Sequence, residues 1–78
     1  MNVAQQPAAA SQHERLVFGS YIREGADHTV VAIRDRGGPW QLYDVTGDMV
    51  TLIETFFPDE QRDAVQAVAE LYLADMRA

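Results

Sequence analysis

The sequence lacks cysteine and lysine, and it contains no long apolar run. Without cysteine, neither a disulfide nor a thiolate-ligated zinc ion can stabilise the fold. The apolar stretches fall well short of the ~20 residues that cross a bilayer, so we expect no membrane contact. The N-terminus also lacks the basic start and apolar stretch of a secretory signal. With the missing cysteines, this pattern predicts a cytoplasmic protein.

Positive charge is scarce as well, because six arginines face twelve acidic residues and leave a formal net charge of -6. All of the excess negative charge lies from Gly38 onward, where only Arg62 and Arg77 are basic. Affinity for nucleic acid comes mostly from basic side chains that release counterions from phosphates, so nucleic acid is not an expected partner. An acidic mimic of nucleic acid that acts through Asp63 and Glu70 is a weaker alternative.

The 78 residues are sufficient for one small domain. Residues 1–14 are rich in Ala, Gln and Ser and carry few large apolar side chains, which predicts a flexible tail. Residues 15–78 are expected to form the single folded domain. A domain of this size has only a marginal core, which makes a pocket of catalytic size difficult to build.

Three strands are predicted from alternating and β-branched segments at residues 15–23, 28–34 and 40–45. Gly19 within the first segment indicates a bulge. Residues 24–27 and 35–38 contain the glycines expected of turns between these strands. The connections are short, so an antiparallel meander is the simplest arrangement.

Helices are predicted after Gly47, because the apolar spacing changes. Five side chains recur at the positions of one helical face: Met49, Leu52, Ile53, Phe56 and Phe57. Pro58 is expected to end this helix, and residues 59–76 are expected to form the next. In the second helix, Leu71 is placed on the apolar face and Leu73 on the polar side.

The predicted fold class is therefore α+β: a three-stranded antiparallel meander followed by two or three helices on one sheet face, with a winged-helix-like order. In this arrangement the strand at residues 40–45 lies at an edge of the sheet. At least one further edge and one sheet face stay open.

The residues that most often carry catalysis or bind metal form no convincing group. His13 and His28 are the two histidines, and neither has an acidic partner at helical spacing. Asp59, Glu60 and Asp63 fall on the first turn and polar side of a predicted helix, where they complement the helix dipole. We therefore expect no enzyme, no metal site and no cofactor.

Trp40 and Tyr43 are the most informative side chains. Counted along the strand, they lie on opposite faces, so only one of them is expected to face the helices. On an edge strand, the unpaired amides around them would accept an extended peptide as a further strand. Tyr72, Leu73 and Met76 are expected to form a helical wall beside this strand.

Residues 32–47 resemble the PqqD-like domains, also called RiPP precursor peptide recognition elements, and the resemblance covers about residues 30–57 in all. Trp40-Gln41-Leu42 and Thr46-Gly47 match the family pattern, whereas Tyr43 stands where the family usually has Asn. The resemblance implies a small non-catalytic domain of three strands followed by helices. It also implies a stand-alone adaptor of the lasso-peptide type, which binds the leader part of a ribosomally made precursor and presents it to a modifying enzyme or leader peptidase.

The predicted function is accordingly a leader-peptide-binding adaptor that adds the leader as a strand beside residues 40–45. The predicted peptide-binding residues are Trp40, Gln41, Leu42, Tyr43, Tyr72, Leu73 and Met76, with Arg34 and Arg36 attracting acidic leader residues. The alternative is a homodimeric structural or regulatory protein-interaction module that uses the open sheet edge or face on both copies.

Overall fold

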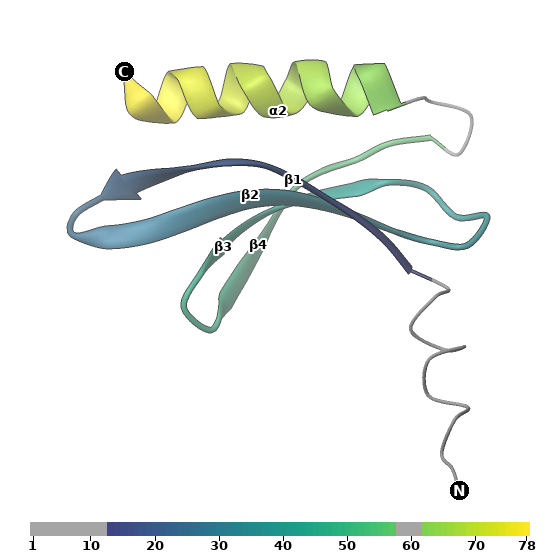
Figure 1. The fold of residues 1–78 in the computed structure, drawn as a ribbon, viewed down its shortest axis with the longest axis horizontal. Helices are drawn as coiled ribbons and strands as arrows, with labels where there is room; N and C mark the ends of the chain where they lie inside the picture. Colours follow the sequence, from purple (N-terminus) through teal and green to yellow (C-terminus); the bar gives the residue numbers. More distant parts are fainter. Residues whose placement is uncertain (1–12, 58–61) are drawn as a thin grey trace, which may run out of the picture.

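A four-stranded antiparallel sheet and one helix make up the described part of the protein (Figure 1). The computed structural model describes residues 13–57 and 62–78. The strands follow one another as neighbours in the sheet, and the helix runs along one sheet face. Their bounds are β1 His13–Arg23, β2 Ala26–Asp35, β3 Gln41–Thr46, β4 Met49–Thr55 and α2 Arg62–Arg77.

The first hairpin agrees with the sequence prediction. β1 and β2 are joined by Glu24 and Gly25, which both have positive φ. The predicted bulge is confirmed, because the pairing of β1 with β2 shifts between Val17 and Gly19. β1 nevertheless begins at His13, so the last two residues of the predicted tail belong to the sheet. The rest of that tail, residues 1–12, lies outside the described residues.

The predicted helix at residues 49–57 is wrong, because this segment contains β4. Gly47, with φ 57°, and Asp48 close a tight hairpin between β3 and β4, in which Thr46 pairs with Met49. A Gly-Asp pair between two strands is a hairpin signal. The helical spacing was misleading because β4 contains a bulge: Leu42 pairs with Glu54 and Tyr43 pairs with Leu52, so that Ile53 is skipped.

The predicted fold class is therefore also wrong. The sheet has four strands, and one helix, not two or three, is found in residues 13–57 and 62–78. The third strand, which was predicted to lie at a sheet edge, is therefore an internal strand. β3 lies between β2 and β4 and pairs with both, so the edges are β1 and β4.

The core lies between α2 and one sheet face, and α2 packs mainly against β1 and β2. Leu73 is 4% exposed and approaches Gly19 closely, since a Cβ built at Gly19 would lie 3.1 Å from Leu73 Cδ1. Leu71 is 72% exposed. The predicted orientation of these two leucines was thus reversed. The fully or nearly fully buried core residues are Tyr21, Val30, Ala32, Trp40, Leu42, Phe56, Val65, Ala69 and Leu73.

No helix among the residues that the structure describes has the length and apolar character required to cross a membrane.

Candidate functional site

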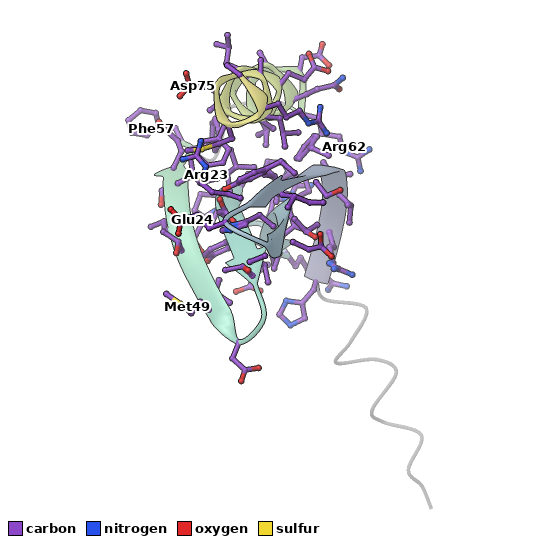
Figure 2. All side chains as sticks on the ribbon, turned by 90° about the vertical axis from the view of Figure 1, so that its left-hand side faces the viewer. Arg23, Glu24, Met49, Phe57, Arg62 and Asp75 are labelled. Carbon is purple, nitrogen blue, oxygen red and sulfur yellow. The ribbon has the colours of Figure 1, made fainter. Side chains whose placement is uncertain are left out.

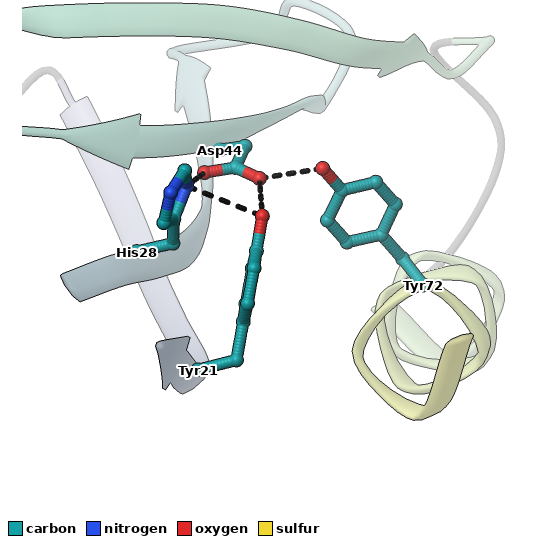
Figure 3. Close-up of polar contacts among 4 residues, drawn as sticks. All are labelled: Tyr21, His28, Asp44 and Tyr72. Carbon is teal, nitrogen blue, oxygen red and sulfur yellow. Dashed lines mark hydrogen bonds and ion pairs between the residues drawn. The ribbon is translucent and has the colours of Figure 1, made fainter. Parts of the chain in front are cut away.

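One buried carboxylate connects three strands and the helix (Figure 3). Asp44 of β3 is 5% exposed, and its side chain accepts hydrogen bonds from the hydroxyls of Tyr21 on β1 and Tyr72 on α2, both at 2.5 Å and both to Oδ2. His28 on β2 places Nδ1 2.8 Å from Oδ1 of the same carboxylate. We call these four residues the Asp44 cluster.

The geometry of the sheet explains how the cluster forms. Tyr21 pairs with His28 across β1 and β2, and their rings stack with centroids 4.6 Å apart. Asp44 pairs with Val30, two residues after His28 and therefore on the same sheet face. Tyr72 reaches the same carboxylate from α2 and meets the Tyr21 ring edge-on. Sequence reasoning missed Asp44, because its burial depends on four segments that meet only in the folded chain.

The hydrogen bonds of the Asp44 cluster shift the pKa values of the carboxylate and of the two phenols in opposite directions. Burial alone would raise the pKa of Asp44, but the hydrogen bonds from Tyr21, Tyr72 and His28 outweigh burial and lower it below its usual value. Burial raises the pKa of both Tyr21 and Tyr72, and the hydrogen bond to Asp44 raises each further. Asp44 is therefore ionised and both phenols are protonated at neutral pH, which is the state that makes two charge-assisted hydrogen bonds.

This arrangement is suited to holding α2 against the sheet. Both oxygens of Asp44 already accept hydrogen bonds from protein donors, and both phenols donate to it. A general base needs an oxygen or nitrogen that can reach a substrate proton. Within residues 13–57 and 62–78 there is no pocket beside the cluster and no group of three acidic or histidine side chains that could hold a metal ion.

Tyr72→Phe is expected to reduce the free energy of unfolding by about 1.5 kcal/mol, because it removes a hydrogen bond to a charged acceptor while keeping the ring. Chemical denaturation monitored by the fluorescence of Trp40, the single tryptophan, measures this loss. Tyr43→Phe is the matched control, since the Tyr43 hydroxyl donates to Gln41 in a partly exposed position. Equal losses in the two variants would contradict a special role for the Asp44 cluster.

The predicted peptide-binding residues do not form one surface. Trp40, Leu42 and Leu73 are buried in the core, so the predicted groove between the third strand and the helix is not formed. Tyr72 is directed to Asp44, and Met76 packs against the core. β3 lies between β2 and β4, and the face of a central strand that is directed toward a helix is readily buried. This position explains why the predicted binding residues of the third strand lie in the core and not on a surface.

Gln41 and Tyr43 lie together on the outer face, which we define as the sheet face away from α2. Tyr43 donates a hydrogen bond to Gln41 at 3.0 Å and pairs across the sheet with Val31 and Leu52. Trp40 lies just before β3 and is buried, so one of the two aromatic residues faces the core and the other does not, as predicted.

Arg34 is already paired within the chain. It donates to both carboxylate oxygens of Glu14, at 2.7 and 2.8 Å, and its guanidinium lies 4.7 Å from the centroid of the Trp40 ring. The hydrogen bond from Arg34 lowers the pKa of Glu14. Arg36 is exposed in the turn after β2. Arg34 therefore contributes to the fold, and of the two arginines predicted to attract acidic leader residues Arg36 alone is exposed.

The two edges of the sheet differ in their protection. β1 carries a bulge, and the side chain of Arg77 donates to the Ser20 backbone carbonyl from Nη2 at 2.7 Å and from Nε at 3.2 Å. Bulges, basic side chains and covering elements are the usual means by which proteins prevent an edge from pairing with another chain. Arg77 of α2 thus occupies one backbone carbonyl of β1.

β4 has little of this protection, and Figure 2 shows Met49 projecting from its first residue position. Its sequence, MVTLIET, contains no basic residue and no proline, and its one irregularity is the bulge at Ile53. Seven large apolar side chains are exposed among the described residues, and three of them, Met49, Val50 and Leu52, lie on this short strand at 66%, 61% and 50% exposure. β4 is consequently the candidate interaction site of the described chain.

Comparison of the chain with protein-family models, with curated proteins and with solved structures finds no match. The functional argument therefore depends on the residues and the geometry described above.

Proposed function

We propose that the protein is a non-catalytic interaction module that binds an extended segment of another polypeptide as an added strand along β4. The observation that carries the proposal is the unprotected β4 edge with its three exposed apolar side chains. An added strand gains affinity from main-chain hydrogen bonds and specificity from alternate side chains. Val50 and Leu52, on the outer face, would contact every second side chain of the partner.

This proposal places the added strand beside β4, whereas the sequence predicted that it would lie beside the third strand. The third strand cannot accept a peptide by strand addition, because β2 and β4 occupy both of its sides. The fourth strand offers the free edge that was expected of the third. A leader peptide of a ribosomally made precursor, delivered to a modifying enzyme or leader peptidase, is the partner that the resemblance to PqqD-like domains implies, and we retain it as part of the proposal.

The Asp44 cluster supports a binding role without catalysis. Its polar atoms hold α2 over β1 and β2, and Arg77 of α2 occupies the Ser20 carbonyl of β1. β1 also carries a bulge and basic side chains, so β4 is the edge that we propose for strand addition.

The test uses peptides from a random twelve-residue display library, selected on the immobilised full chain and then titrated into isotope-labelled protein. We expect NMR shift changes centred on residues 49–55. Burial of a leucine side chain contributes about 1.5–3 kcal/mol, so Leu52→Lys is expected to weaken binding about tenfold or more. Leu71→Lys is the matched control, because Leu71 is 72% exposed on α2, and it should bind like the unchanged protein.

Selected peptides that shift only β1 or α2 would contradict the proposal. Equal weakening by the substitutions at positions 52 and 71 would contradict it as well, since that result would reflect the charge of the protein and not the β4 edge.

A further inference from the structure

We infer that, when no partner peptide is present, the β4 edge is occupied by β4 of a second copy of this chain, paired antiparallel about Leu52. The inference rests on the proposed function insofar as both use the same edge. A second copy of the chain would then control access of a peptide to the β4 edge.

The length of β4 determines the register that pairs the most residues. An antiparallel pair of identical strands is symmetric about one central position, and for Met49–Thr55 the centre is Leu52. Leu52 then faces Leu52 of the other copy and Thr51 faces Ile53, whereas the bulge at Ile53 places Glu54 on the face opposite to that of Val50, so regular pairing is confined to the centre of the strand. No other centre places all seven positions of the two strands opposite one another.

Charge favours the same register. Glu54 is the one charged residue of β4, and with Leu52 at the centre its backbone position lies opposite that of Val50. A shift of the centre to Thr51 would place Glu54 opposite Asp48, and like charges in directly opposed positions destabilise a strand pair. The Leu52-centred register avoids this repulsion and joins the exposed side chains of the two copies.

The side chains at the centre of the pair also match. In the Leu52-centred pair, Leu52 and Val50 of each copy continue the outer face, where Val17, Val31 and Tyr43 already lie in one row with Leu52. The two rows would join at the paired Leu52 side chains into one apolar strip across eight strands. Strand pairing and apolar contact therefore favour the same dimer.

The dimer should be weak and sensitive to salt. A single seven-residue strand pair is smaller than the interface of about 800 Å² per partner that stable complexes bury. Each copy also carries a formal net charge of -6, so the two copies repel each other at long range. Added salt screens that repulsion and should strengthen the dimer.

Sedimentation equilibrium of the full chain, from micromolar to millimolar protein and at low and high salt, tests the inference. We expect a monomer–dimer equilibrium that moves toward dimer as salt is added. Leu52→Lys and Leu52→Glu are each expected to lower the association constant about tenfold or more, because each places two like charges opposite one another. Leu71→Lys should dimerise like the unchanged protein.

The decisive measurement mixes the two position-52 variants. If position 52 of one copy faces position 52 of the other, Lys and Glu lie opposite one another in the mixture. A heterodimer then forms, and added salt weakens it. Failure of the mixture to associate, with both single variants monomeric, would overturn the Leu52-centred register. An unchanged protein that stays monomeric at every concentration would overturn the inference.

The outcome is separable from that of the proposed function. A monomer that still binds library peptides along β4 overturns the second-copy inference and leaves the peptide-binding function standing. A salt-strengthened, Leu52-dependent dimer that no selected peptide displaces supports the inference and overturns peptide binding at this edge.

Discussion

Replacement of Trp40 by alanine is expected to remove at least about a third of the free energy of unfolding at 25 °C. Trp40 is 1% exposed and is among the four largest fully buried side chains. Loss of a buried tryptophan costs about 4 kcal/mol, and a chain of this length has a total stability of about 4–12 kcal/mol. Far-UV circular dichroism during urea titration measures the effect without the tryptophan signal.

Trp40→Phe provides the matched comparison. It keeps an aromatic ring under the Arg34 guanidinium and removes the indole N–H, which is buried and has no protein hydrogen-bond partner within the described residues. We therefore expect a much smaller loss of stability than for alanine. A folded Trp40→Ala variant with a loss below about 1 kcal/mol would contradict the core role and would favour the exposed, peptide-contacting role predicted from sequence.

Asp44→Asn is expected to lower the free energy of unfolding at pH 6 by about 3 kcal/mol. Asparagine has nearly the same size, but its amide group replaces one of the two oxygens that accept hydrogen bonds from Tyr21, Tyr72 and His28. At least one buried donor then loses its acceptor. Urea unfolding followed by Trp40 fluorescence measures the difference, and Asp48→Asn in the exposed β3–β4 turn serves as the control.

Acid should remove the advantage of Asp44 over asparagine. The pKa of Asp44 is lower in the folded protein than its usual value, so the unfolded chain takes up the proton more readily. The contribution of the ionised carboxylate is complete above the unfolded-state pKa of about 3.9 and is lost as pH falls through the folded-state pKa. The stability difference between the natural protein and Asp44→Asn should shrink accordingly between pH 6 and pH 2, and a difference that grows in acid would contradict this account.

Local patterns predicted the first half of the fold well. The segments at residues 15–23, 28–34 and 40–45 coincide with β1, β2 and β3 to within two residues at each end. The bulge beside Gly19 was also predictable, because a glycine within a strand marks such sites. These features depend on neighbours in the sequence, and local composition therefore carries the information.

The second half shows where local patterns are insufficient. At β4, the bulge at Ile53 breaks the alternation of the strand and produces apolar spacing that also fits a helix. The Gly47-Asp48 turn was the signal that could have separated the two possibilities. In α2, Leu73 follows Ala69 by four residues and Val65 by eight, so helical spacing already favours its burial over that of Leu71, and Leu73 closely approaches Gly19.

The sequence by itself determined the strand segments 15–45, the amphipathic C-terminal helix, the net negative charge and the lack of cysteine-based stabilisation. Tertiary structure alone decided that β3 is internal, that β4 is the unprotected edge and that Asp44 is buried among two phenols and an imidazole. The reason is physical: strand and helix periods are local properties, whereas the neighbours of a strand and the partners of a buried carboxylate depend on which distant segments pack together.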